Sequence, residues 1–139
     1  IDQFNNINRI YGDRVADQVL DHLGKLLLEY VRESDEVARY GQAAICVMTP
    51  STSIQDAHQL AERIRQRVEA QPLLLHAGTE KEARIAIKIS IGVAATLGSF
   101  DSMEKLLQRT EVALQQARQE GGNRVAVSEA GVTGFRASA

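Results

Sequence analysis

Arg32 and Asp35 are the residues whose types and spacing point most directly to ligand chemistry. They stand three positions apart in the charged stretch 32–36, after an expected helix, so both side chains fall on one side of a tight helix end. An Arg guanidinium can donate to two acceptors of a planar group, hold a phosphate or stack on an aromatic ring. An Asp carboxylate accepts hydrogen bonds from N–H donors. The competing interpretation is a solvated ion pair worth less than about 1 kcal/mol.

The other reactive side chains form no catalytic pattern. The single cysteine, Cys46, lies inside an apolar run, which favours a buried and inert thiol. Ser90 has no His or Asp partner that the sequence identifies, so we assign it no nucleophilic role. The histidines lack ligand spacing, and we interpret them as surface or packing residues rather than metal ligands. They are His22, His58 and His76.

Residues 37–48, VARYGQAAICVM, predict a β-hairpin, because two apolar-rich runs flank a Gly-containing turn. The tip of this hairpin carries no acid, base or nucleophile. Its residues are Gln42, Ala43 and Ala44. The turn is therefore either an ordinary hairpin or a catalytic turn that has lost its reactive side chains.

The composition is that of an ordinary soluble globular domain. The 139 residues suffice for one domain with a core, and 44% are apolar and 24% charged. A net charge of -2 favours neither a nucleic acid nor a membrane surface as partner. One cysteine forms no internal disulfide, which agrees with a reducing compartment. The chain opens without Met, so we interpret it as a cytoplasmic piece of a larger protein whose other parts can be membrane-bound.

Apolar spacing of three and four residues predicts three amphipathic helices. The first covers 13–31, and the second contains 57–68, with Ser53 as its candidate N-cap. The third follows Asp101-Ser102, which can cap it. The expected helix ends are Gln71-Pro72 for the second helix and Gly121-Gly122 for the third.

The strongest strand signal covers residues 85–93, which carry a β-branched residue at every odd position. A short final strand is expected at 124–127, and a further strand before Ile1. The order helix, hairpin, helix, strand, helix, strand predicts an α+β sheet with helices packed on it. The domain is expected to cover 1–127, with 128–139 as a tail or linker.

Short stretches along the chain resemble the GGDEF domains of bacterial diguanylate cyclases, from Ile1 to about Val127. Each stretch alone is a weak signal, but they occur in the family's order and spacing. They are Ile1-Asp2-Gln3-Phe4 with Asn8, Gly12 and Asp17, then Ala38-Arg39-Tyr40-Gly41, AERIR at 61–65, ISIGV at 89–93, Ala113-Leu114 with Ala117, and Gly121 to Asn123. The resemblance implies a palm-like sheet related to nucleotidyl cyclases.

Active members of that family condense two GTP molecules into cyclic di-GMP at the interface of two domains. The chemistry needs divalent cations, and these need carboxylate oxygens at fixed positions. The family places the acids on its signature turn and on an Asp just before the residue that matches Ile1. Here the signature turn is 41–45, GQAAI, in which Ala43 and Ala44 fill both acidic positions. A methyl group ligates no metal.

Further departures affect the expected phosphate contacts. Gln42 replaces a glycine that lets phosphates approach backbone N–H groups. Asn5 stands where the family has a lysine, and Arg9 stands where it has an acidic residue. The family also has two late cationic positions. Arg118 keeps the charge at the first, and Gly122 carries none at the second. We therefore expect a catalytically inactive domain without a metal or other cofactor.

Asn8 and Asp17 match the two family residues that read the guanine of GTP. An Asp accepts from guanine N1 and N2, and an Asn amide both donates and accepts. The alternative is that neither residue binds a nucleotide, with Asn8 in a turn and Asp17 on the solvated side of the first helix. We favour that alternative, since base reading without a metal or phosphate grip is weak.

Arg32 and Asp35 match an R-x-x-D motif that forms an inhibitory cyclic di-GMP site in many family members. The resemblance adds Arg63 from the next helix, at the position of a further family Arg. We expect a regulatory domain of a bacterial signalling protein that binds cyclic di-GMP at these residues and acts on a flanking domain or protein partner, with a homodimer as a further option. We expect no nucleic-acid or membrane contact.

Three alternatives stay open. The first is a nucleotide-free interaction or dimerisation module that keeps the fold as a scaffold. The second is a domain that binds GTP without turnover. The third is an enzyme with residual diguanylate cyclase activity or unrelated nucleotide chemistry.

Overall fold

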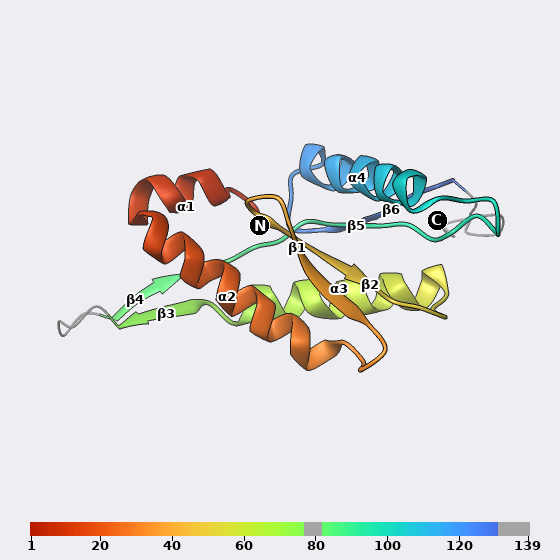
Figure 1. The fold of residues 1–139 in the computed structure, drawn as a ribbon. Coiled ribbons are helices and arrows are strands. Elements are labelled where there is room, and N and C mark those ends of the chain that lie inside the picture. Colours follow the sequence, from red (N-terminus) through yellow and green to blue (C-terminus); the bar gives the residue numbers. More distant parts are fainter. Residues whose placement is uncertain (77–81, 131–139) are drawn as a thin grey trace.

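The computed structural model describes residues 1–76 and 82–130 of the chain (Figure 1). Its helices are α1 (Phe4–Tyr11), α2 (Asp13–Tyr30), α3 (Ile54–Ala70) and α4 (Met103–Gln119). The strands are β1 (Glu36–Tyr40), β2 (Ala44–Met48), β3 (Leu73–His76), β4 (Glu82–Ile85), β5 (Ile91–Val93) and β6 (Val125–Val127). The predicted α+β class is confirmed, and the predicted tail 128–139 lies outside the described residues from 131 onward.

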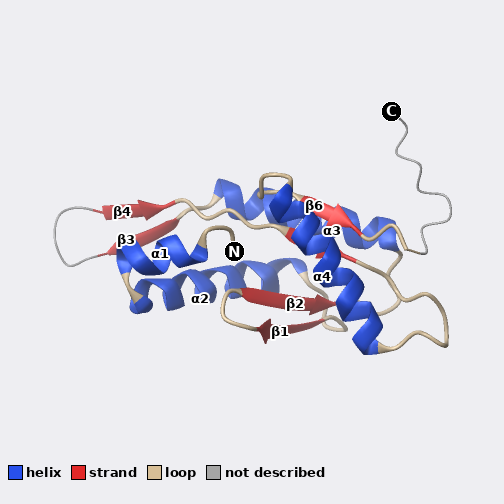
Figure 2. Cartoon of the chain, turned by 90° about the horizontal axis from the view of Figure 1, so that it is seen from above, coloured by secondary structure: helices blue, strands red, loops and turns tan. Residues whose placement is uncertain are grey.

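The described strands form three two-stranded sheets. β1 pairs with β2 and β3 with β4, both antiparallel, and β5 pairs with β6 in parallel. β5 and β6 contact α4 on one side and α3 on the other. Figures 1 and 2 show the β3–β4 pair at the end of the molecule remote from α4. The hairpin of β1 and β2 lies between α2 and α4 (Figure 1).

The helices follow the predicted pattern. α2 covers 13–30, and Leu20, Leu23 and Leu27 are among the side chains that it buries. Ser53 caps α3 by accepting from the Asp56 N–H at 3.1 Å, and Ser102 caps α4 in the same way. The sequence prediction missed α1, a short helix that is mostly polar and buries only Ile7.

The prediction of one strand over 85–93 was wrong. β4 ends at Ile85 and β5 begins at Ile91, so residues 86–90 belong to neither strand. The alternation still holds across this segment, since Ile87 and Ile89 are buried while Lys88 is exposed. The Lys88 carbonyl accepts from the backbone N–H of Asp2 at 2.9 Å. The alternating pattern therefore predicted correctly which side chains are buried. It did not predict which neighbouring segment the backbone pairs with.

Arg109 and Asp101 fix the loop that leads into α4. Arg109 donates to both carboxylate oxygens of Asp101 and to the Ala95 carbonyl at 3.0 Å, and Asp101 also accepts from the Leu97 N–H at 3.0 Å. Hydrogen bonds from Arg109 and Leu97 lower the pKa of Asp101 to about 2. The carboxylate therefore stays charged at neutral pH and holds the loop against α4.

Gly92 is the point of closest approach between β5 and α4. A Cβ built on this residue would lie 2.3 Å from the Thr110 carbonyl oxygen and 2.4 Å from the Leu114 nitrogen. Both are backbone atoms of a helix, so no side-chain rotation relieves the clash. Only glycine therefore lets α4 lie this close to the strand.

We predict that Gly92→Ala lowers the free energy of unfolding by at least about 2 kcal/mol, because α4 must move away from β5. The matched control is Gly24→Ala in α2, where nothing lies within 4 Å of a built Cβ. That change should stabilise the helix by about 0.5–1 kcal/mol. Urea denaturation measures both, and a Gly92→Ala variant as stable as the parent contradicts the packing argument.

Candidate functional site

Arg32 and Asp35 meet directly after the C-terminal end of α2. The Arg32 backbone N–H donates to Asp35 Oδ2 at 2.8 Å, and Arg32 Nη2 donates to Asp35 Oδ1 at 3.3 Å. The Asp35 side chain is only 1% exposed, whereas the Arg32 side chain is 58% exposed. The carboxylate is thus covered and the guanidinium faces solvent.

The loop before α3 supplies two further acceptors to Arg32. Its Nη2 donates to the Pro50 carbonyl at 3.2 Å and to Thr52 Oγ1 at 2.6 Å. The Thr52 hydroxyl in turn donates to the Pro50 carbonyl at 3.0 Å. Sequence reasoning missed Thr52. The sequence signal was a loop rich in hydroxyl side chains. It does not indicate which of these hydroxyls accepts a hydrogen bond from Arg32, 20 residues earlier in the chain.

Arg63 is exposed on α3, the helix that follows Thr52. In the part of the chain that the structure describes, no hydrogen bond or ion pair joins Arg63 to Arg32 or Asp35. The nearby Arg65 is engaged elsewhere, with Glu62, Glu69 and Asn123.

The signature turn keeps the backbone of a tight hairpin. Tyr40 lies opposite Ala44, and Gly41 has φ 68°, a left-handed conformation that favours glycine. The Ala43 carbonyl oxygen lies 3.0 Å from the backbone nitrogen of Ile1. The turn positions Gln42, Ala43 and Ala44 therefore have a fixed frame, but neither alanine carries an atom that ligates a cation.

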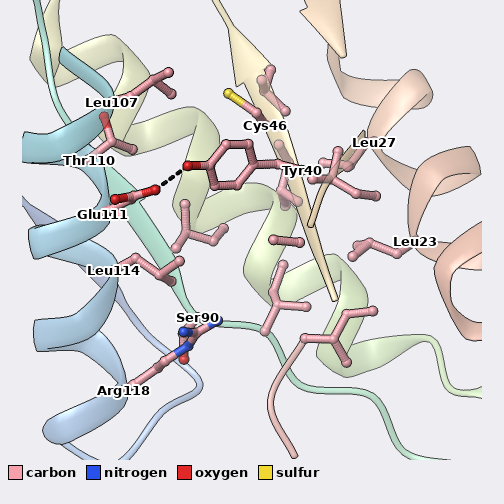
Figure 3. Close-up of a pocket in the computed structure, with 18 residues that line it drawn as sticks. Leu23, Leu27, Tyr40, Cys46, Ser90, Leu107, Thr110, Glu111, Leu114 and Arg118 are labelled. Atoms are coloured by element: carbon pink, nitrogen blue, oxygen red, sulfur yellow. Dashed lines mark hydrogen bonds between the residues drawn. The ribbon is translucent and has the colours of Figure 1, made fainter. Parts of the chain in front are cut away.

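A cavity of about 150 Å³ lies beside the turn, between the hairpin, α2, α4 and residues 89–92 (Figure 3). Its lining is mainly apolar, with Leu23, Leu107 and Leu114 among the side chains. Tyr40 donates a hydrogen bond to Glu111 across it, which raises the pKa of Tyr40. Arg118 and Ser90 also line the cavity (Figure 3).

The carboxylates near the turn are already engaged. Asp2 accepts from the Ser90 hydroxyl at 2.6 Å and from the Asn123 N–H at 2.7 Å, and Glu111 accepts from Tyr40. No group of three or more His, Cys, Asp or Glu side chains that could hold a metal occurs among residues 1–76 and 82–130. These carboxylates therefore tie elements together.

Asn8 and Asp17 lie on different helices. The alternative that placed Asn8 in a turn was wrong, because Asn8 lies within α1 and is half-buried. Asp17 is exposed on α2, as the same alternative predicted. No hydrogen bond links the two side chains in the described structure. Their assignment as a guanine site stays a prediction.

The remaining candidates have structural surroundings. His22 Nε2 lies 3.1 Å from the Gln71 carbonyl, and half-buried Cys46 has a pKa raised by burial. His76 was predicted to be a surface or packing residue, and its side chain lies outside the described part of the structure. None of the described helices is long and apolar enough to cross a membrane.

A family model for the GGDEF domain of diguanylate cyclases matches residues 1–124. The chain therefore belongs to this family, whose members act in cyclic di-GMP signalling, and the family resemblance found in the sequence is confirmed. It is 38% identical over 125 residues to the response regulator PleD of Caulobacter vibrioides, covering 90% of this chain and 27% of that protein. It is 36% identical over 129 residues to diguanylate cyclase A of Treponema denticola, covering 93% and 33%. The chain thus spans about a quarter to a third of these relatives.

Solved structures agree with this placement. The GGDEF domain of DgcB from Caulobacter crescentus, in complex with c-di-GMP, superposes with a TM-score of 0.85 at 26% identity, covering 93% of this chain and 72% of that one. The active GGEEF domain of a diguanylate cyclase from Vibrio cholerae gives a TM-score of 0.77 at 26% identity, covering 92% and 78%. The predicted palm-like fold is therefore confirmed.

We predict that Asp35→Ala lowers the free energy of unfolding by about 1–2 kcal/mol, because it removes the covered carboxylate that accepts two hydrogen bonds from Arg32. The neighbouring Glu33 is exposed, so Glu33→Ala is the matched control and should change stability by less than about 0.5 kcal/mol. Denaturation without ligand measures both. Equal effects of the two changes contradict the structural role of Asp35.

Proposed function

We propose that this domain is a regulatory receptor for cyclic di-GMP that does not synthesise it. The observation that carries the proposal is the Arg32 guanidinium, which faces solvent while Asp35, Pro50 and Thr52 hold it in place. The DgcB structure in complex with c-di-GMP shows that a domain of similar fold takes this ligand. Binding is then transmitted to a flanking domain or a protein partner.

The contacts leave Arg32 able to act on a ligand. All its side-chain hydrogen bonds within the described structure use Nη2, so Nε and Nη1 remain available. Two guanidinium N–H groups match the O6 and N7 acceptors of a guanine edge or two phosphate oxygens. Asp35 directs both oxygens at Arg32. In the ligand-free state Asp35 therefore serves to position Arg32.

The signature turn supports the absence of synthesis. Two GTP molecules carry high negative charge, which cations held by hard oxygen ligands must neutralise. Ala43 and Ala44 offer only methyl groups at the two acidic positions, and the carboxylates of Asp2 and Glu111 accept hydrogen bonds from protein groups. We propose that the turn serves as a scaffold that connects β1 and β2.

A nucleotide-free interaction module is the second candidate function. No hydrogen bond or ion pair joins Arg63 to Arg32 in the described structure, and the Asp35 carboxylate is covered. If the arginines do not cooperate, the fold alone remains as a docking scaffold. The titrations below separate the two candidates.

We predict that cyclic di-GMP binds this domain with a dissociation constant in the micromolar range or tighter. Arg32→Ala should abolish detectable binding, and Asp35→Ala and Arg63→Ala should weaken it at least about tenfold, or about 1.4 kcal/mol. Glu33→Ala, which removes an adjacent charge, should leave the affinity unchanged. Isothermal titration calorimetry measures all five proteins, and no heat of binding with the parent protein favours the interaction module.

We also predict no cyclic di-GMP product when the pure domain is incubated with GTP and Mg²⁺ or Mn²⁺. The physical reason is the lack of ligating atoms at Ala43 and Ala44. Chromatography of the reaction mixture with product standards measures the outcome. An active diguanylate cyclase assayed in parallel is the control. Product that scales with the concentration of this domain contradicts the proposal of an inactive turn.

A further inference from the structure

We infer that Thr52 is a positioning residue of the cyclic di-GMP site, which holds the Arg32 guanidinium in its ligand-facing orientation. The inference rests on the proposed function and extends the site beyond the R-x-x-D pair. It assigns a role to a loop residue that lies 20 positions away in sequence and joins the pair through one hydrogen bond.

The distances around Arg32 Nη2 indicate that Thr52 is its main hydrogen-bond acceptor. This nitrogen carries two hydrogens but has three acceptors, at 2.6 Å from Thr52, 3.2 Å from Pro50 and 3.3 Å from Asp35. At most two of these hydrogen bonds can be well aligned at once. The Thr52 contact is the shortest by 0.6 Å (3.2 minus 2.6), so the hydroxyl is the principal acceptor on this side of the guanidinium.

The Thr52 hydroxyl is itself oriented. It donates its only hydrogen to the Pro50 carbonyl at 3.0 Å, so its lone pairs are left to face Arg32. The residue between them, Ser51, has a left-handed φ of 52°, which brings the Pro50 carbonyl and the Thr52 side chain together. A tight loop therefore fixes the acceptor before any ligand arrives.

Such an anchor matters because an exposed Arg has many rotamers. A guanidinium held on one edge by Thr52, Pro50 and Asp35 loses less conformational freedom when a nucleotide takes its other edge. The next residue, Ser53, caps α3, the helix that carries Arg63.

The first test compares Thr52→Val with Thr52→Ser. Valine keeps the size and branching of threonine but removes the hydroxyl, whereas serine keeps the hydroxyl. We expect Thr52→Val to weaken cyclic di-GMP binding about five- to tenfold, because an unanchored Arg32 side chain must be immobilised when the ligand binds. Thr52→Ser should bind within about twofold of the parent, and the Tm of both variants should match the parent. Equal affinity of the valine variant and the parent overturns the inference.

A second readout needs no ligand. Side-chain ¹⁵N relaxation of the Arg32 Nε–H group should show increased mobility in Thr52→Val and parent-like values in Thr52→Ser. If the parent protein does not bind cyclic di-GMP, the proposed function fails, and the relaxation result alone decides whether Thr52 positions Arg32. Unchanged Arg32 mobility in Thr52→Val overturns that role.

Discussion

The close packing of α4 on β5 at Gly92 is the constraint on which the rest of the structure depends. The α4 backbone lies where any larger residue would place its Cβ, so this helix cannot shift without losing the contact. The contact fixes where Glu111 and Arg118 stand over the cavity beside the signature turn (Figure 3). Tyr40 then ties the hairpin to α4 through Glu111. The Tyr40–Glu111 hydrogen bond is therefore one of the contacts that hold the frame of the turn.

The domain has two regions with different chemistry. Around the signature turn, the side chains that face the cavity are mainly apolar, and the carboxylates of Asp2 and Glu111 hold elements together. After α2, the structure presents a guanidinium to solvent and supports it with three acceptors. We propose that the domain recognises its ligand through the Arg32 region and does not synthesise it, because the signature turn lacks cation ligands. A receptor needs only the second region, provided that a neighbouring domain responds to its occupancy.

Sequence reasoning reached the elements that local signals encode and missed those set by tertiary contacts. The Ser53 and Ser102 caps and the apolar face of α2 follow from short-range spacing, and the structure confirms them. The segment 85–93 changes pairing partner between β4 and β5, and alternation carries no information about partners. The contact of Arg32 with Thr52 spans 20 residues and leaves no periodic signal. Family resemblance, rather than spacing, supplied Arg63.

The most direct test of the receptor proposal is a titration of the ¹⁵N-labelled domain with cyclic di-GMP, followed by amide chemical shifts. The account predicts saturable shifts at Arg32, Asp35 and Thr52, and at Arg63 on α3. Residues 41–44 of the signature turn should move little. Shifts confined to the signature turn and Arg118, or no shifts at millimolar ligand, would contradict the claim that the domain is a cyclic di-GMP receptor working through Arg32.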